Sequence, residues 1–269
     1  MSTLRAKNAL LDYDVTGAGP TIVQLHGLTS SRARDAGLGF DLSSRTPGHR
    51  VVRYDARGHG ASAGDRDPRS YTWSCLALDL IALLDAEAPM EAVHGVGQSM
   101  GTATLVHAAM AQPTRFTSLV LGIPPTAWQS RAIQRRVYRA NADLVERLGL
   151  APLVDADLSS ARPPASADTT AVPPSVEEDL LPTVFRGAAL ADLPTPEQVA
   201  TIEVPTLVLA WVDDPAHPLS TAQQLCDLLP HARLVVARTP QDVQAWPDLV
   251  ADHVSANRVV ADESAIAGA

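Results

Sequence analysis

The chain has 269 residues, of which 46% are hydrophobic, and this length and composition allow one sizeable core. Its formal net charge of -9 and the scattered positions of its 21 Lys and Arg residues argue against nucleic acid or an anionic membrane as a partner. Cys75 and Cys226 lie in separate helical patterns without Cys-x-x-Cys spacing, which favours reduced core thiols. No segment has the apolar length of an export signal or a membrane span, so we expect a cytoplasmic protein.

Short apolar, β-branched runs bounded by turn residues predict buried strands along the chain. The predicted strands are Ala9 to Val15, Thr21 to Leu25, Val51 to Tyr54, Ala92 to Gly97, Thr117 to Gly122, Pro205 to Trp211 and Arg233 to Ala237. Helical patterns lie between them, most clearly at Thr72 to Ala86, Thr102 to Ala111, Ser220 to Leu229 and Trp246 to Ala256. Strands that alternate with helices predict an α/β fold, in which a mostly parallel sheet has helices on both faces.

This alternation is interrupted between about residues 126 and 199. A helical run, Gln129 to Leu148, is followed by a stretch rich in Ala, Pro, Ser and Asp from Ala151 to Pro174. Prolines predict an irregular or mobile connection within this stretch, at Pro163, Pro164, Pro173 and Pro174. The last residues, Val259 to Ala269, are rich in Ala and lack a full apolar face, so we expect a frayed tail.

Gly97-Gln98-Ser99-Met100-Gly101 falls at the junction between a predicted strand and a predicted helix. A serine between two glycines at such a junction is held on a sharp, strained turn, where its hydroxyl is accessible to a base. The motif therefore predicts that Ser99 is a nucleophile.

Two further motifs follow predicted strands, His26-Gly27-Leu28-Thr29 and Asp55-Ala56-Arg57-Gly58-His59-Gly60. In this order and at these separations, the three motifs resemble the α/β-hydrolase superfamily. The resemblance implies an α/β-hydrolase fold in a single domain over residues 1–269, with about residues 126–199 as a helical cap insertion. It also implies that the backbone N–H groups of Leu28 and Met100 form an oxyanion hole.

The resemblance places a catalytic acid after the strand that ends near Trp211, where the chain reads Trp211-Val212-Asp213-Asp214-Pro215. Asp214 is the preferred acid and Asp213 the alternative. A second interpretation stays open, in which both residues only cap the helix that begins near Ser220 or form a turn with Pro215.

The base is the point at which the sequence departs from the family pattern. Family members usually carry a histidine after the last strand, but here Gln241 falls nearest that position, and glutamine cannot accept a proton from serine at neutral pH. The best replacement is His217, on the same loop as Asp214, with packing or capping of that loop as the alternative role. His26 is a distant candidate because it is close to the oxyanion loop. The other histidines are expected to be structural.

The sequence says little about the substrate. The aromatic residues expected to line a pocket between cap and core are Trp128, Tyr138, Phe185 and Trp211. Two roles are considered for Arg131. It could bind a substrate carboxylate, but an ion pair on a helix surface is favoured. A metal site at Asp213, Asp214 and His217 is disfavoured, because no second cluster of ligands accompanies them.

We therefore predict a serine hydrolase that acts on a small ester, thioester or lactone through an acyl-enzyme on Ser99, with His217 as base and Asp214 as acid. Two alternatives stay open. One is a catalytically impaired hydrolase-fold protein with a binding or accessory role, suggested by Gln241, and the other is a carbon–carbon bond hydrolase or lyase on the same scaffold. We expect a small-molecule acyl substrate and no metal, cofactor, nucleic-acid or membrane partner.

Overall fold

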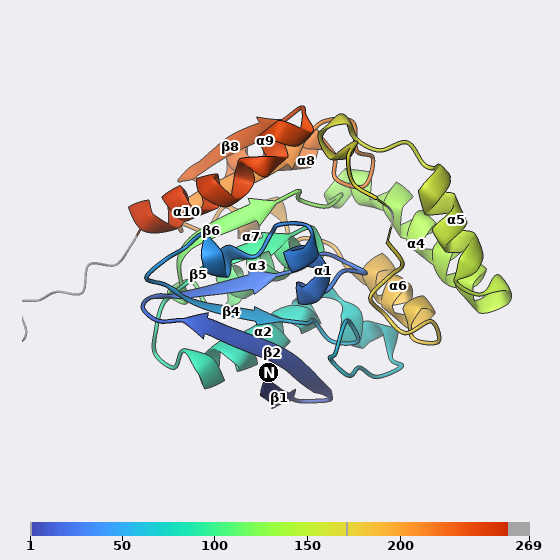
Figure 1. Ribbon diagram of the computed structural model, residues 1–269, viewed down its shortest axis with the longest axis horizontal. Coiled ribbons are helices and arrows are strands. Elements are labelled where there is room, and N and C mark those ends of the chain that lie inside the picture. Colours follow the sequence, from blue (N-terminus) through green and yellow to red (C-terminus); the bar gives the residue numbers. More distant parts are fainter. Residues whose placement is uncertain (1, 171, 258–269) are drawn as a thin grey trace, which may run out of the picture.

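The computed structural model describes residues 2–170 and 172–257, and in these residues eight strands form one sheet (Figure 1). The strands are β1 Ser2–Ala6, β2 Ala9–Gly17, β3 Thr21–Leu25, β4 Arg50–Tyr54, β5 Val93–Gln98, β6 Phe116–Gly122, β7 Thr206–Trp211 and β8 Ala232–Ala237. Their order in the sheet is β1-β2-β4-β3-β5-β6-β7-β8. The first two strands pair antiparallel and β2 is antiparallel to β4, whereas the pairs from β4 to β8 are parallel. The predicted α/β fold with a mostly parallel sheet is confirmed.

Helices lie on both faces of this sheet and at its end. The α-helices are α1 Arg32–Gly37, α2 Trp73–Glu87, α3 Met100–Ala111, α4 Trp128–Leu148, α5 Ala151–Ser159, α6 Leu181–Leu190, α7 Pro196–Val199, α8 Leu219–Leu228, α9 Pro240–Gln244 and α10 Trp246–Ala256. Short 3-10 turns occur at η1 Leu42–Ser44, η2 Pro68–Tyr71 and η3 Pro164–Ser166. No helix in the described part of the chain combines the length and the apolar character needed to cross a membrane.

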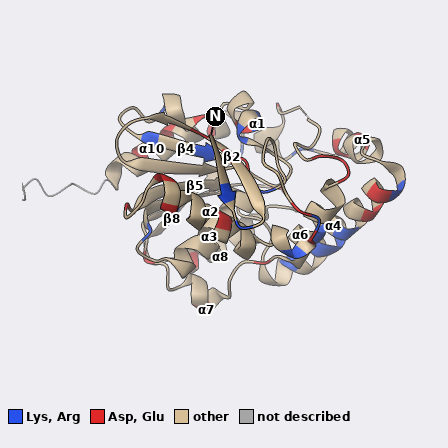
Figure 2. Cartoon of the chain, turned by 90° about the horizontal axis from the view of Figure 1, so that it is seen from below, with Lys and Arg blue, Asp and Glu red and all other residues tan. Residues whose placement is uncertain are grey.

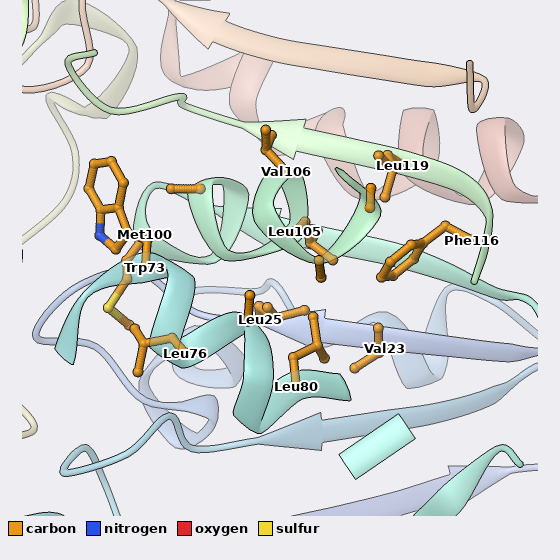
Figure 3. Packing of buried hydrophobic residues seen from close by; sticks show 14 of the residues in the cluster. Val23, Leu25, Trp73, Leu76, Leu80, Met100, Leu105, Val106, Phe116 and Leu119 are labelled. Atoms are coloured by element: carbon orange, nitrogen blue, oxygen red, sulfur yellow. The ribbon is translucent and has the colours of Figure 1, made fainter. Parts of the chain in front are cut away.

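The core is divided by the sheet, because successive side chains of a buried strand point to opposite faces. Strand β3 illustrates this: Val23 packs in the cluster formed with α2 and α3, whereas its neighbour Ile22 packs in the cluster formed with α10. Figure 3 shows the first cluster, where Leu76 and Leu80 of α2 meet α3 over the sheet. Burial on both faces explains why the central strands are almost continuously apolar.

The segment between β6 and β7 lies at one end of the sheet and contains α4, α5, η3, α6 and α7. Helices α4 and α6 pack against each other, and α6 also packs against η2 of the sheet-forming part. No helix was predicted in the stretch from Ala151 to Pro174, where an irregular connection was expected at Pro163, Pro164, Pro173 and Pro174, but α5 occupies its first part, Ala151–Ser159. Pro152 stands in the first turn of this helix, where a missing N–H costs no hydrogen bond, so it starts the helix rather than breaking it. The irregular part begins after Ser160.

The cysteines, the basic residues and the C-terminal tail were also considered in the sequence analysis. Cys75 on α2 and Cys226 on α8 are free thiols, but both are half-exposed, so the expected core position is wrong. Figure 2 shows basic residues on several elements, with a run along α4 made up of Arg131, Arg135, Arg136, Arg139 and Arg147. The predicted tail, Val259 to Ala269, lies outside the described residues.

Candidate active site

Ser99 occupies the sharp turn between β5 and α3. Its φ of 50° and ψ of -109° lie in a region that non-glycine residues rarely adopt, and such strain is typical of a nucleophile held above a strand-to-helix turn. The flanking glycines permit the turn. A Cβ on Gly97 would lie 2.5 Å from the carbonyl carbon of Gly101, and a Cβ on Gly101 would lie 2.7 Å from the carbonyl oxygen of Leu25. Only glycine fits at either position.

A continuous chain of hydrogen bonds joins Ser99 to the loop between β7 and α8. The hydroxyl Oγ of Ser99 lies 2.7 Å from Nε2 of His217. On the other side of the imidazole, Nδ1 of His217 lies 2.8 Å from Oδ2 of Asp214. The structure therefore brings together the three side chains that the sequence analysis selected as nucleophile, base and acid, in the arrangement that nucleophilic catalysis by serine requires.

The backbone of the β7–α8 loop turns around the Asp214 carboxylate. Its Oδ1 accepts the N–H of Ala216 at 2.8 Å and that of His217 at 3.3 Å. These local bonds form a tight turn, which allows a histidine only three residues after the aspartate to meet it side chain to side chain. The carbonyl of Ala216 in turn accepts the N–H of Thr126, which fixes the loop to the start of the β6–β7 segment.

The Asp214 carboxylate is held in its ionised form. Burial by itself raises the pKa of this group, but the hydrogen bond and charge of His217, together with the N–H of Ala216 and the indole N–H of Trp211, lower the pKa to about 2. The indole nitrogen of Trp211 lies 2.9 Å from Oδ2, the same oxygen that faces His217. An ionised carboxylate in this position fixes the tautomer of the imidazole with its proton on Nδ1, which leaves Nε2 free to accept the Ser99 proton.

The fallback acid and the expected position of the base lie elsewhere. Asp213 is exposed, with a φ of 61°, and its side chain has no hydrogen bond to another described residue. Gln241 is exposed on α9 and lines neither cleft at Ser99. In the described part of the chain, no group of three His, Cys, Asp or Glu side chains is arranged to hold a metal ion.

The backbone N–H groups expected to form an oxyanion hole, those of Leu28 and Met100, belong to residues next to or near Ser99. Met100 follows Ser99 as the first residue of α3. Leu28 follows Gly27, which lies close to Ser99: a Cβ added to Gly27 would lie 3.5 Å from Cβ of Ser99. Neither N–H donates to an acceptor among the described residues. Unpaired donors beside a serine hydroxyl can stabilise negative charge that develops on a substrate oxygen.

The remaining histidines near these motifs are structural. His26 is buried, accepting the N–H of Ala56 at Nε2 and contacting the carbonyl of Gly27 through Nδ1. Burial lowers its pKa to about 4, so the ring is neutral and both nitrogens are occupied. His59 is also buried against His26, with ring centroids 5.2 Å apart. His107 on α3 is half-buried, and its Nε2 contacts the carbonyl of Asp192.

Two clefts meet at Ser99. The first, of about 660 Å³, extends past Phe40, Ile123, Trp211 and Trp246 to α9. The second, of about 490 Å³, extends between α4, α5 and α6 and is lined by Val137, Tyr138, Leu153 and Phe185. Of the aromatic residues expected to line a pocket, Tyr138, Phe185 and Trp211 do so, and Trp246 was missed because it belongs to a helix at the far end of the chain.

Trp128 and Arg131 have structural roles instead. Trp128 lines neither cleft, and its indole N–H donates to the carbonyl of Pro194. Arg131 is fully buried, so both roles considered for it, a substrate contact and a surface ion pair, are wrong. Its guanidinium donates to the carbonyls of Ala188 and Ala191 at the end of α6 and to the hydroxyl of Thr126. Arg131 thus joins the start of the β6–β7 segment, at Thr126, to the end of α6.

The comparisons with known proteins agree with this geometry. A family model described as serine aminopeptidase, S33, matches residues 18–240. The chain belongs to this family of α/β-hydrolases. The resemblance to the superfamily that the three motifs indicated is therefore confirmed.

Two curated relatives of this α/β-hydrolase cover most of its length. It is 30% identical over 196 residues to "3-oxoadipate enol-lactonase 2" of Acinetobacter baylyi, which covers 69% of both chains. It is 31% identical over 229 residues to "Putative carbamate hydrolase RutD" of Variovorax paradoxus, which covers 81% of this chain and 83% of the relative.

Solved structures share the fold over almost the whole chain. A hydrolase from Pseudomonas aeruginosa PA01 superposes with a TM-score of 0.77 and 26% identity, covering 95% of this chain and 97% of that one. The enol-lactonase from Burkholderia xenovorans LB400 superposes with a TM-score of 0.72 and 22% identity, covering 94% of this chain and 100% of that one. At this identity the match shows a shared fold only. The family model and the two curated relatives support an enzyme of the hydrolase class.

Proposed function

We propose that this α/β-hydrolase is a serine hydrolase that cleaves a small carboxylic ester, thioester or lactone through an acyl-enzyme on Ser99. The observation that carries the proposal is the hydrogen-bonded chain from Ser99 Oγ through the His217 imidazole to the Asp214 carboxylate, at 2.7 and 2.8 Å. The relative named as an enol-lactonase supports a lactone or ester as substrate, and the relative named as a carbamate hydrolase adds carbamates to the compounds worth testing.

The first half of the reaction forms the acyl-enzyme. Ser99 Oγ attacks the substrate carbonyl carbon while Nε2 of His217 takes the hydroxyl proton, and the imidazolium that forms is stabilised by the ionised Asp214. The carbonyl oxygen becomes an oxyanion and accepts the N–H groups of Leu28 and Met100. When the tetrahedral intermediate collapses, His217 gives its proton to the leaving alkoxide or thiolate.

The second half releases the acyl group. Water loses a proton to Nε2 of His217 and attacks the carbonyl carbon of the acyl-enzyme, again with the oxyanion at Leu28 and Met100. Collapse of this intermediate breaks the bond to Ser99 Oγ, and His217 returns the proton to that oxygen. The net reaction consumes one water and produces a carboxylic acid and an alcohol or thiol.

The alternative of an impaired protein with a binding role rests on Gln241. That side chain is exposed on α9 and outside both clefts, whereas a histidine from another loop contacts Ser99. The strained φ of 50° at Ser99 also favours catalysis, because a binding role gives no reason to hold a serine in a costly conformation. We therefore take His217 as the base in a relocated position.

A fluorophosphonate probe, which reacts only with an activated serine, tests this proposal. We expect the purified protein to be labelled at Ser99, as located by mass spectrometry, and Ser99→Ala to be unlabelled. His217→Ala should be labelled at least about a thousandfold more slowly, because a serine without its base is a poor nucleophile. His231→Ala, which removes an exposed histidine, is the matched control and should be labelled like the wild type.

The opposite pattern would reject the proposal. A wild-type protein that resists the probe, together with labelling gained in Gln241→His, would mean that the triad is broken and that the usual position of the base has been lost. Labelling that persists unchanged in His217→Ala would assign the base to another residue.

A further inference from the structure

The two clefts at Ser99 share a positively charged wall. The residues that line both of them include Ser99, His217 and Leu28 of the proposed machinery, and also Arg34 and Arg162. Among the described residues, no aspartate or glutamate lines both clefts. In a chain with a net charge of -9, the junction at the nucleophile thus presents two arginines, of which only Arg162 forms an ion pair, with Asp157.

Seven arginines in the described part of the chain, Arg34 among them, have neither an ion pair nor a side-chain hydrogen bond. All of the others are exposed, namely Arg5, Arg136, Arg139, Arg147, Arg233 and Arg238. Arg34 alone is half-buried, and no described carboxylate or carbonyl accepts from its guanidinium. Removing a guanidinium from water without a partner is unfavourable, so a half-buried and unpaired arginine in a cleft is arranged for an anionic ligand.

The surroundings of Arg34 hold it in place. Its backbone N–H donates to the hydroxyl of Ser31, which caps α1. The neighbouring Asp35 is buried and accepts the Ser30 hydroxyl at 2.8 Å, and it forms no ion pair with Arg34. Burial raises the pKa of Asp35 to about 6, although the charge of Arg34 acts to lower it. Arg162 is less free, because it pairs with the exposed Asp157 at 3.1 Å. Arg34 is thus the principal cation of the wall and Arg162 an auxiliary one.

We propose that Arg34, assisted by Arg162, binds a carboxylate of the substrate, so that the preferred substrate is an ester or lactone whose acyl part carries a second, free carboxylate. The inference rests on the proposed function, because it places this carboxylate in the clefts that meet at Ser99. A planar guanidinium matches a carboxylate with two parallel hydrogen bonds, which fixes the orientation of the acyl group as well as its affinity.

A matched pair of activated esters tests the preference. The 4-nitrophenyl monoester of glutaric acid and 4-nitrophenyl pentanoate have acyl chains of the same length and differ in one terminal carboxylate. We expect the wild-type kcat/KM to be at least about tenfold higher for the glutarate ester. Arg34→Gln should lower the ratio of the two kcat/KM values roughly 10- to 100-fold, mainly through KM for the glutarate ester, as loss of a charged hydrogen bond predicts. Arg162→Gln should lower it less, and Arg5→Gln, an exposed arginine on β1, should leave it unchanged.

Binding to the Ser99→Ala variant gives a readout that does not depend on turnover. Calorimetry with glutarate and with neutral glutaramide should give binding of glutarate only, weakened at least tenfold when Arg34→Gln is added. If the protein resists the fluorophosphonate but glutarate binds through Arg34, the proposed function fails and the carboxylate site stands. If the protein is labelled and hydrolyses both esters equally, and glutarate does not bind, the carboxylate site is rejected and the proposed function stands.

Discussion

His217 and Asp214 contact each other side chain to side chain although only three residues separate them, with Nδ1 of the histidine 2.8 Å from Oδ2 of the aspartate. The proposed acid and base therefore belong to one loop, between β7 and α8. Members of the α/β-hydrolase superfamily usually carry the base after the last strand, but here that segment forms α9, which has no histidine, and the sequence analysis selected His217 instead. The geometry at Ser99 is complete without a histidine on α9.

Trp211 should contribute to activity through Asp214. Its indole N–H donates to the same carboxylate oxygen that faces His217, at 2.9 Å, and helps to keep the pKa of Asp214 low. Trp211→Phe keeps an aromatic ring against Trp246 but removes this donor, so we expect kcat on a 4-nitrophenyl ester to fall roughly 3- to 20-fold, as the loss of one hydrogen bond to a charged group predicts. An unchanged kcat would mean that the backbone N–H groups of the loop suffice to orient the carboxylate.

Gly97 should be intolerant of any side chain. A Cβ at this position would lie 2.5 Å from the carbonyl carbon of Gly101, in backbone that cannot move without distorting the turn at Ser99. We expect Gly97→Ala to lower the free energy of unfolding by about 1–3 kcal/mol or more in urea titrations. The control is Gly37→Ala, where an added Cβ has no atom within 4 Å and the change should stay within about 0.5 kcal/mol. Equal effects at the two sites would contradict the steric argument.

Arg131 should be essential for stability rather than for substrate binding. Its guanidinium donates to two carbonyls of the α6 end and lies 4.1 Å from the centre of the Trp73 ring. Arg131→Met fills part of the volume but leaves those buried carbonyls without donors, which should cost about 3 kcal/mol in the free energy of unfolding. Arg136→Met, at an exposed position of the same helix, should change it by less than about 0.5 kcal/mol. The ratio of KM values for the two test esters should be the same in both variants.

His26 and His59 should make the fold sensitive to acid. Burial lowers the pKa of His26 to about 4, and burial together with the nearby charge of protonated His26 lowers that of His59 to about 3, whereas an unfolded histidine titrates near 6.5. Below about pH 6.5 the unfolded chain therefore binds more protons than the folded chain. Each of the two histidines lowers the free energy of unfolding as the pH falls from about 6.5 towards its folded pKa. Asp35 acts in the opposite direction, because burial raises its pKa to about 6 and its folded state binds a proton first.

A comparison of urea titrations isolates the histidine contribution. Between about pH 7 and about pH 4.5, the free energy of unfolding of the wild type should fall by about 2–3 kcal/mol more than that of His59→Gln, whose side chain does not titrate. Asp35 contributes equally to both proteins and cancels in the difference. Identical pH dependences would show that the His59 site admits the proton without loss of structure.

Most of the fold could be read from the sequence because the central strands are short, buried apolar runs. The predicted strand Thr21 to Leu25 coincides with β3, and the other predicted strands overlap their observed counterparts. β1 was missed because it is an edge strand whose residues are mostly exposed, so no apolar run marks it. α5 was missed because its composition resembles that of the proline-rich stretch that follows it.

Some residues of the candidate site could be predicted from the sequence and others could not. Ser99 is marked by its flanking glycines, and Asp214 and His217 are near each other in the sequence, so local patterns suffice to suggest them. The role of Arg131 depends on carbonyls of α6, about sixty residues later in the chain. Arg34 and Trp246 reach the same cleft from opposite ends of the sequence, and no periodicity or motif relates them. Such residues become visible only when the chain is folded.

With His217 as the proposed base, one wall of the first cleft carries no proposed catalytic residue. This wall is formed by α9, whose residues Pro240, Val243 and Gln244 line the first cleft in the segment where α/β-hydrolases usually carry the catalytic histidine. Helix α9 also packs against η3 of the β6–β7 segment. Substitutions there can reshape the space offered to a substrate while the groups that make and break bonds stay on two other loops. This helix is therefore a natural starting point for changing the substrate range by directed evolution, since its side chains can vary without removing nucleophile, base or acid.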